Sequence, residues 1–561
     1  MNKVTNLFNS FTFSTNKLVL FTCSYVIFLL NIPFFIKTTA AITRLDEFNQ
    51  FFLISIPVLL LCLSVFLQCF FAFRWITKPL LILLVMVSSV VFYSSITYGI
   101  VFDYGMIQNT VETDTAEALS YVNFSAFIFL FTFGILPSIL IAKIRLTYKS
   151  FLGELFDRTK LMGVSFGIVV LIVLVFYSSY ASIGRNNRDL VGYLTPYALI
   201  DSTVKYLQRN YLYPPLKFTL LDTNPVIVNE KHTKHVTVLV LGETARAQSF
   251  SLNGYHKPTN QFTEKLGVVS FKNVSSCGTA TAVSVPCMFS RLDKENYDKR
   301  LAIAQQNALD IIHLAGADVL WVSNNNGSCK GVCNRVKTLQ IDTTNTDPLC
   351  DGKYCVDEVL LRPLKQKLAS LTHEDTLIVL HMIGSHGPTY YKRYPDKNRI
   401  FIPDCQRSDI QNCSTEELAN TYDNTIAYTD YVLSKVISEL NMLSQSQDIE
   451  TSMIYISDHG ESLGESGVFL HGLPYAFAPK EQTHVPLIYW ADSLHQNERV
   501  SCVSKMSDKN ISHDNVFDIL LSEMSVDSKT FIKQNNPLNQ CKTAGAIAQT
   551  VHQNTKNGAN R

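Results

Sequence analysis

HVTVLVLGE, residues 235–243, is a run of β-branched and aliphatic residues that ends in one carboxylate. Continuous apolar runs of this length are typical of strands that are buried on both faces of a sheet. The segments 301–317 and 417–443 have the apolar spacing of helices. Strands that alternate with helices predict an α/β domain with a mostly parallel sheet and helices on both faces. The other strand-like stretches are ADVLWVSNN (317–325), DTLIVLHMIGSHGP (375–388), SMIYISDHGE (452–461) and VPLIYW (485–490).

Side chains that commonly bind metal ions follow several of these predicted strands. Ligands of open α/β sheets bind beyond the carboxyl ends of the strands, so residues at these ends are expected to gather. Carboxylate oxygens and imidazole nitrogens are ligands of zinc. Each residue alone has an ordinary explanation in a turn or at the surface, but their shared position favours a metal site. The residues are Glu243, His381, His386, Asp458, His459 and His471.

SSCGTATAVSVPCMFSR, residues 275–291, places several hydroxyl groups at the start of a predicted helix. A helix N-terminus favours an anion such as phosphate, because backbone N–H groups and the helix dipole point toward it. An alcohol is a weak nucleophile at neutral pH, and a metal ion can activate it as it activates bound water. Thr279, Thr281 and Ser284 are the candidate nucleophiles, and helix capping or core packing is the alternative role for two of them.

The first 180 residues contain five apolar runs, each about long enough to cross a bilayer as a helix. A cleaved signal peptide is the alternative for the first run, but this run is long, lacks a clear cleavage site and is followed by four more. We expect a five-helix transmembrane domain over 1–180, an interfacial linker over 181–230 and a catalytic domain over 231–561. A helix through Leu199–Arg209 could lie along the membrane surface or be an ordinary linker helix. The five runs are Leu18–Phe35, Phe51–Phe73, Pro79–Ile100, Phe124–Ala142 and Leu161–Tyr180.

Basic residues predict the orientation of these spans, because Lys and Arg are concentrated in cytoplasmic loops. Lys3 and Lys17 precede the first run, Arg74 and Lys78 follow the second, and five basic residues lie between the fourth and the fifth. The intervening connections hold two basic residues or none. The N-terminus is therefore predicted to be cytoplasmic, and the chain after Tyr180 is predicted to lie outside. The net charge of +1 points to no charged partner, and no nucleic acid partner is expected.

The cysteines agree with this orientation. Three lie in apolar runs, and the other ten all follow Tyr180. An even, locally clustered set outside the cytosol is typical of disulfides. Zinc is the alternative for the pairs at 329/333 and 350/355, but an oxidising compartment disfavours free thiolates. Connectivity does not follow from sequence alone, and we expect neighbours to pair. The expected pairs are Cys277–Cys287, Cys329–Cys333, Cys350–Cys355, Cys405–Cys413 and Cys502–Cys541.

The motifs GETAR, CGTATAVSVPCMFSR, SHGP, SDHGESLGE and HG occur in this order along the chain. Their combination resembles the lipid A phosphoethanolamine transferases, a family of the alkaline phosphatase superfamily that includes the mobile colistin-resistance enzymes. The resemblance covers nearly the whole chain. It implies an α-helical five-span membrane domain in the bacterial inner membrane and an α/β periplasmic catalytic domain of the alkaline phosphatase and sulfatase type.

The resemblance also implies a role for individual residues. Thr281 would be the nucleophile, and Glu243, Asp458 and His459 would join it around one tightly bound zinc, with a second zinc as an open question. His386 and His471 match histidines that bind a second metal or the substrate phosphate. The 277–287 disulfide would fix the loop that presents Thr281. The substrate-binding residues would be Asn109, Thr113 and Glu117, spaced by four as on one face of a helix, together with Lys330.

The implied reaction transfers phosphoethanolamine from phosphatidylethanolamine to a lipid A phosphate, with a covalent intermediate on threonine and resistance to polymyxin as the result. A monomer is expected.

Close to Lys330, Gly327 stands where some members of the family have Ser, with Ser328 beside it. The resemblance therefore leaves the substrate contact at this position open. A phosphoglycerol transferase, or transfer to another envelope glycan, is the alternative function. A sulfatase is disfavoured because Met288 replaces the Arg of the motif [C/S]-x-P-x-R, and a sensor without turnover is disfavoured by the complete set of nucleophile and metal ligands.

Overall fold

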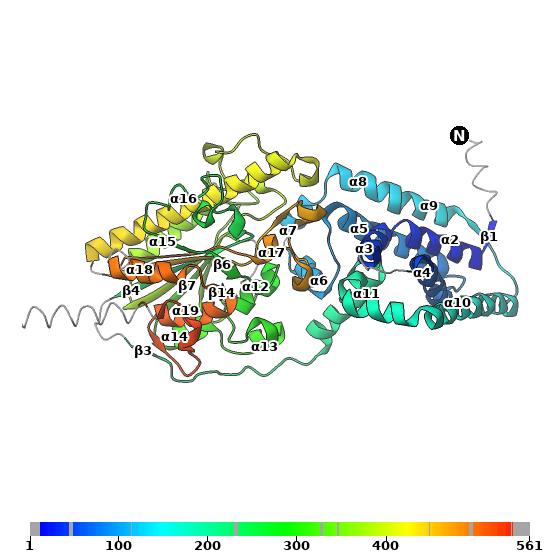
Figure 1. Ribbon diagram of the computed structural model, residues 1–561, viewed down its shortest axis with the longest axis horizontal. Helices are drawn as coiled ribbons and strands as arrows, with labels where there is room; N and C mark the ends of the chain where they lie inside the picture. Colours follow the sequence, from blue (N-terminus) through cyan, green and yellow to red (C-terminus); the bar gives the residue numbers. More distant parts are fainter. Residues whose placement is uncertain are drawn as a thin grey trace, which may run out of the picture. The chain divides into compact units, whose positions relative to one another are not determined.

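The computed structural model describes residues 12–43, 49–113, 115–228, 234–325, 329–344, 347–447, 449–492, 497–539 and 541 (Figure 1). The chain divides into two compact units. The helical unit comprises residues 1–107 and 122–212, and the sheet unit comprises residues 108–121 and 213–561. The short segment 108–121 therefore belongs to the sheet unit, although apolar helices precede and follow it in the sequence.

Among the described residues of the helical unit, four helical stretches are long and apolar enough to cross a membrane: Gln50–Phe71, Thr77–Tyr98, Phe124–Lys143 and Phe151–Ala181. A fifth span exists if α2 and α3, which meet at an angle of 55°, are counted as one. The predicted first run crosses the break between these two helices. Asn31 lies at the break, where its side chain donates to the carbonyl groups of Val26 and Thr195, and Pro33 follows. The main helices are α2 (Thr15–Phe28), α3 (Ile32–Thr43), α4 (Gln50–Phe71), α5 (Thr77–Tyr98), α8 (Phe124–Leu130), α9 (Leu136–Lys143), α10 (Phe151–Asn186) and α11 (Tyr197–Leu207).

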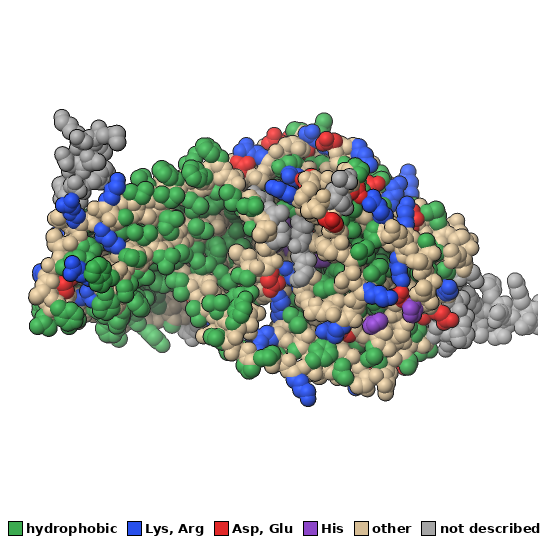
Figure 2. Space-filling model, turned by 180° about the vertical axis from the view of Figure 1, so that it is seen from behind, with side chains coloured by type: hydrophobic (Ala, Val, Ile, Leu, Met, Phe, Trp, Pro, Cys, Tyr) green, Lys and Arg blue, Asp and Glu red, His purple; other side chains and the backbone are tan. Residues whose placement is uncertain are grey.

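The surface of the helical unit is mostly hydrophobic. Figure 2 shows apolar side chains spread over most of it, with some charged side chains at one end, whereas charged side chains of both signs are spread over the sheet unit. Phe51, Phe124 and Leu174 are each more than two-thirds exposed. An apolar surface of this extent is not typical of a soluble monomer and matches contact with lipid. The prediction of a helical membrane region is therefore confirmed, with four or five spans.

The sheet unit is built on a seven-stranded sheet in which β13 runs opposite to the other six strands. The helices α15 (Leu361–Leu368) and α16 (Thr415–Gln447) lie on one face, and α14 (Ala308–Leu314) and α19 (Val516–Glu523) on the other (Figure 1). This is the predicted α/β architecture. The strand order is β5 (Val269–Phe271), β13 (Leu487–Ala491), β10 (Glu450–Ser457), β4 (His235–Gly242), β9 (Asp375–His381), β7 (Asp318–Ser323) and β8 (Lys337–Gln340).

The centre of the sheet explains why the first stretch is apolar throughout. Every residue of β4 from Val236 to Gly242 is buried, because β10 and β9 flank this strand and helices cover both faces. The register pairs Ser457 of β10 with Gly242, and Leu241 with His381 of β9. The residues that follow these three strands therefore emerge at the same edge of the sheet.

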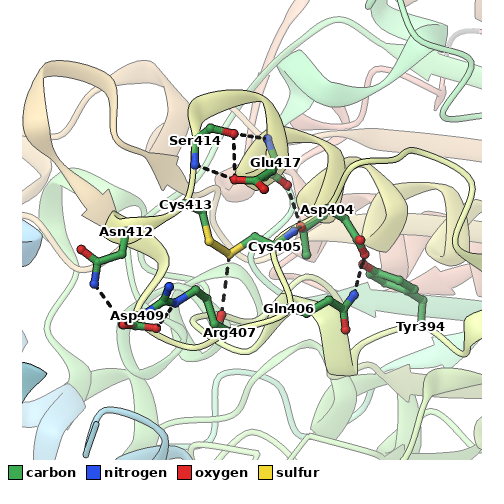
Figure 3. The surroundings of a disulfide bond; sticks show 11 residues. Tyr394, Asp404, Cys405, Gln406, Arg407, Asp409, Asn412, Cys413, Ser414 and Glu417 are labelled. Carbon is green, nitrogen blue, oxygen red and sulfur yellow. Dashed lines mark hydrogen bonds and ion pairs between the residues drawn. A yellow bond between two sulfur atoms is a disulfide. The ribbon is translucent and has the colours of Figure 1, made fainter. Parts of the chain in front are cut away.

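Five disulfides tie the sheet unit, and they are the neighbour pairs expected from the sequence. Figure 3 shows the surroundings of Cys405–Cys413, which lies just before α16. Ser414 and Glu417 form a capping box, because each side chain binds the backbone N–H of the other residue. The disulfide therefore fixes the loop that leads into the longest helix of the sheet unit.

We expect the disulfide that closes the longest loop to contribute most to stability. Cys502–Cys541 spans 39 residues and Cys329–Cys333 spans 4. Loop-closure entropy predicts a loss of about 4 kcal/mol for the first and about 2 kcal/mol for the second. The measurement is guanidinium unfolding of the full chain in detergent, with each pair replaced by alanine. Equal losses in the free energy of unfolding for the two double variants would contradict loop-closure entropy as the source of the stabilisation.

Candidate active site

Three ionisable side chains meet at the edge of the sheet where β4 and β10 end. Glu243 follows β4, and Asp458 and His459 follow β10. Each has at most 1% of its surface exposed. The His459 Nε2 atom lies 3.4 Å from Glu243 Oε1 and 3.3 Å from Asp458 Oδ2. One potential metal-ligand atom from each residue lies within 4.8 Å of the others. We call these three residues the acidic cluster.

The acidic cluster has the properties of a cation site. Asp458 Oδ2 is buried and accepts no hydrogen bond from the part of the chain that the structure describes. Burial opposes the charge on His459, but the carboxylates of Asp458 and Glu243 outweigh burial and raise its pKa. The cluster therefore favours a positive charge at its centre. Two carboxylates, an imidazole and a nearby hydroxyl are oxygen and nitrogen donors of the kind that zinc prefers, so the residues fit this metal.

The nearby hydroxyl belongs to Thr281, the first residue of α12 (Thr281–Met288). Its Oγ1 atom lies 2.9 Å from Glu243 Oε1 and 3.3 Å from His459 Nε2. The N-cap of α12 is Ala280, so the hydroxyl of Thr281 is not used to cap the helix. The structure thus brings Thr281 to the acidic cluster at the N-terminus of a helix, where an anion is favoured.

The other two candidate hydroxyls have structural partners. Thr279 donates through Oγ1 to the carbonyl of Leu473 at 2.6 Å. Ser284 accepts from the backbone N–H of Gly278 at 3.0 Å through its Oγ atom. Both contacts hold the loop between Cys277 and α12. Of the three hydroxyls, therefore, only that of Thr281 has hydrogen-bond partners within the acidic cluster.

Thr244 adopts a strained conformation beside the acidic cluster. Its φ of 60° lies in the left-handed region, which β-branched residues rarely occupy. The Thr244 N–H donates to Asp458 Oδ1, its hydroxyl donates to Glu243 Oε1, and its carbonyl accepts from the hydroxyl of Tyr422. The surrounding contacts therefore hold a turn that aims the Glu243 carboxylate.

Sequence reasoning missed Thr244, Tyr422 and Asn325. Asn325 donates through Nδ2 to Glu243 Oε2 at 2.8 Å and to the carbonyl of Met382 at 3.1 Å. It ends the stretch ADVLWVSNN at the carboxyl end of a strand, so the rule applied to the other strand ends could have found it. Nothing in the local sequence of Thr244 or Tyr422 indicates their contact.

The predicted histidines His386 and His471 lie next to the acidic cluster. The ring of His471 is 4.5 Å from that of His459, and the ring of His386 is 5.4 Å from that of His471. The Nδ1 atom of His471 lies 3.2 Å from Oε2 of the buried Glu461. Burial raises the pKa of Glu461 to about 8 and lowers that of His471 to about 3. His381, in contrast, packs against Trp321 with ring centroids 5.4 Å apart.

The segment 108–121 differs from the expected single helix. The structure contains α6 (Tyr104–Glu112) and then α7 (Thr115–Ser120), so Asn109, Thr113 and Glu117 do not share one continuous helical face. The Thr113 hydroxyl donates to the carbonyl of Asn109 at 2.6 Å, so Thr113 is held against the last turn of α6. The side chain of Glu117 lies outside the described residues, as do Gly327 and Ser328.

Two lysines tie this segment to the rest of the sheet unit. Glu112 lies 2.6 Å from the Lys299 ammonium and 3.5 Å from that of Lys330. The side chain of Lys330 is only 8% exposed, and it also donates to the Glu112 carbonyl at 3.3 Å. The structure therefore places the predicted Lys330 against the segment that carries Asn109 and Thr113.

The fold and the acidic cluster define a sulfatase-like protein, and residues 235–526 match the Sulfatase family. Residues 59–211 match the family described as Phosphoethanolamine transferase EptA/EptB. The chain is 40% identical to phosphoethanolamine transferase EptA of Escherichia coli (strain K12) over 527 residues, which cover 92% of this chain and 95% of the relative. It is 35% identical to phosphatidylethanolamine transferase Mcr-1 of Escherichia coli over 516 residues, which cover 88% of this chain and 94% of that relative.

A solved structure agrees over both units. The integral membrane protein lipooligosaccharide phosphoethanolamine transferase A (EptA) from Neisseria meningitidis superposes with a TM-score of 0.87 at 34% identity. The match covers 94% of this chain and 99% of that protein. The chain belongs to the EptA family of phosphoethanolamine transferases. The resemblance found in the sequence motifs is thereby confirmed.

Proposed function

We propose that this protein transfers phosphoethanolamine from phosphatidylethanolamine to a phosphate of lipid A. The observation that carries the proposal is the Thr281 hydroxyl, 2.9 Å from Glu243 in a buried acidic cluster at the start of a helix. The names of the relatives support the substrates, because one is a phosphatidylethanolamine transferase and another is Kdo(2)-lipid A phosphoethanolamine 7''-transferase.

The transfer proceeds in two displacements. The Thr281 oxygen attacks the phosphorus of the donor, a Thr281–phosphorus bond forms, and the bond from phosphorus to the diacylglycerol oxygen breaks. Thr281 donates its hydrogen bond to Glu243, so the hydroxyl proton leaves on that side, and the diacylglycerol oxygen takes up a proton. A lipid A phosphate oxygen then attacks the same phosphorus, the Thr281–phosphorus bond breaks, and the Thr281 oxygen takes a proton back from the Glu243 side, which restores the hydroxyl.

The acidic cluster and Thr281 would hold one zinc ion. When bound, zinc would lower the pKa of the hydroxyl and offset negative charge on the phosphoryl oxygens. His386 and His471 would bind a second metal or the substrate phosphate. Asn109, Thr113, Glu117 and Lys330 would contact the donor lipid, and Lys330 supplies a buried positive charge for its phosphate.

The proposed location is the bacterial inner membrane, with five spans in which α2 and α3 count as one. The N-terminus would be cytoplasmic, as the basic residues predict. The transmembrane region 1–180, the interfacial linker 181–230 and the periplasmic catalytic domain 231–561 would then place Thr281 on the side where donor and acceptor lipids meet. The enzyme is proposed to act as a monomer.

Expression of the chain in a polymyxin-sensitive Gram-negative host should raise tolerance to polymyxin. Surface attraction is worth about 1 kcal/mol per basic group of a cationic peptide, and a phosphoethanolamine cap adds an ammonium to each modified phosphate. Mass spectrometry of lipid A from these cells should show the added group. Cells that express Thr281→Ala should show neither change. Unmodified lipid A beside an active, folded enzyme would exclude lipid A as acceptor and favour a phosphoglycerol transferase or another glycan acceptor.

A further inference from the structure

His513 is a buried histidine that contacts two segments of the site from outside the acidic cluster. It follows β14 (Asn510–Ser512), which pairs with β6 (Asn273–Ser275), the strand that leads into the nucleophile loop. None of its surface is exposed. Its Nδ1 atom lies 3.1 Å from the backbone nitrogen of Cys277, and its Nε2 atom lies 3.0 Å from the carbonyl oxygen of Ser457.

These two partners fix the protonation state of the ring. The Cys277 N–H can only donate, so Nδ1 must carry a lone pair, and the Ser457 carbonyl can only accept, so Nε2 must carry the proton. The ring is therefore neutral and held in a single tautomer. Burial lowers the pKa of His513 to about 3, in agreement with this assignment.

The two contacts connect the nucleophile to the acidic cluster. Cys277 begins the loop that reaches Thr281, and the 277–287 disulfide joins it to α12. Ser457 directly precedes Asp458, and its hydroxyl accepts from the N–H of Ala245 and donates to the carbonyl of His459. A shift of the His513 ring would therefore change the position of Thr281 relative to Asp458 and His459.

The loop has few alternatives to this contact. The Cys277 residue is 6% exposed, so its N–H would lose its partner without gaining water if the ring were removed. The neighbouring bonds, from Ser276 N–H to the Thr483 carbonyl and from Gly472 N–H to the Thr279 carbonyl, hold other points of the loop. Only His513 ties this loop directly to the residue before Asp458 within the described part of the chain.

We propose that His513 is a positioning residue, which holds the Thr281 loop at a fixed distance from the acidic cluster through one neutral imidazole. The inference rests on the proposed function for its catalytic consequence, but not for the structural link itself. Displacement of a reacting group by about 1 Å can cost about 10²-fold in rate. His513 thus acts through Thr281 without touching substrate.

The test separates the two hydrogen bonds. His513→Asn places an acceptor near the position of Nδ1, His513→Gln places a donor near Nε2, and His513→Leu keeps neither. We expect His513→Leu to lower kcat for labelled phosphatidylethanolamine by about 10²-fold with a small change in KM. His513→Asn and His513→Gln should each recover only part of this loss, because each restores one of the two bonds, to Cys277 or to Ser457. His313→Asn is the control, since His313 contacts only the carbonyl of Ala317 through its ring nitrogens among the described residues.

A second measurement does not depend on turnover. The 277–287 disulfide of His513→Leu should open faster under mild reductant than that of wild-type protein, and His513→Asn should restore the slower rate. If the wild-type protein transfers no phosphoethanolamine but this difference remains, the proposed function fails and the structural link stands. Equal kcat values and equal reduction rates for wild type and His513→Leu would overturn the inference. A loss of kcat in His513→Leu that is no larger than its unfolded fraction, with an unchanged reduction rate, would overturn it as well.

Discussion

Thr281→Ala should fold normally and lose transfer activity by about 10³-fold or more, as enzymes do when the nucleophile is removed. The hydroxyl is the only group of this residue that reaches Glu243 and His459. Alanine is a better helix former than threonine, and the N-cap of α12 is Ala280, so the helix should not be weakened. The unfolding temperature of the metal-free protein should change little.

Matched variants and a covalent adduct make this prediction specific. Ser284→Ala and Thr279→Val remove neighbouring hydroxyls that hold backbone groups, so these variants should lose stability while retaining Thr281 beside Glu243. After incubation of wild-type protein with donor lipid, peptide mapping should place phosphoethanolamine on Thr281. An adduct on Thr279 or Ser284, or an active Thr281→Ala enzyme, would exclude Thr281 as nucleophile.

The architecture of the sheet unit could be predicted because each strand is marked by its own short stretch of sequence. Buried strands such as β4 and β10 need continuous apolar residues, and polar residues such as Glu243 and Asp458 mark where they end. The rule that ligands bind beyond the carboxyl ends of parallel strands then brings these ends together without knowledge of the strand order. The observed pairing of Ser457 with Gly242 supplies the register that the rule left open.

The remaining features depend on contacts between distant parts of the chain. Tyr422 contacts Thr244 across 178 residues, and His513 contacts Cys277 across 236. Neither position has a spacing or motif that identifies its partner. The left-handed φ of Thr244 is likewise set by three surrounding hydrogen bonds, so no propensity predicts it. A sequence pattern can name the side chains that do chemistry more easily than those that hold them.

The helix break in segment 108–121 shows a second limit. A spacing of four predicts a common face only if the helix continues, and the sequence does not state where it stops. Here α6 ends at Glu112, and the Thr113 hydroxyl bonds back to Asn109. Glu112 of this segment also contacts Lys299 and Lys330, which follow it in the sequence by 187 and 218 residues. Tertiary contacts therefore determine how these residues are presented.

Zinc should raise the unfolding temperature of the wild-type protein strongly, and Glu243→Gln should abolish most of this increase. A ligand at about 1,000 times its Kd stabilises the folded state by about 4 kcal/mol. Glu243 supplies one of the two carboxylates of the acidic cluster, and an amide at this position has no negative charge with which to bind the metal. The hydrogen bonds from Thr244 and Asn325 hold the Glu243 carboxylate in place within the cluster.

The comparison must separate metal binding from general effects of a buried charge. Asp375→Asn is the matched control, because Asp375 is a buried carboxylate at the first residue of β9, at the opposite edge of the same sheet. The difference in unfolding temperature with and without zinc, after removal of metal by a chelator, should be retained in this control and lost in Glu243→Gln. Since each protein serves as its own metal-free reference, any change in the stability of the metal-free form cancels. A full zinc-dependent increase in Glu243→Gln would place the metal elsewhere and leave the acidic cluster without its proposed role.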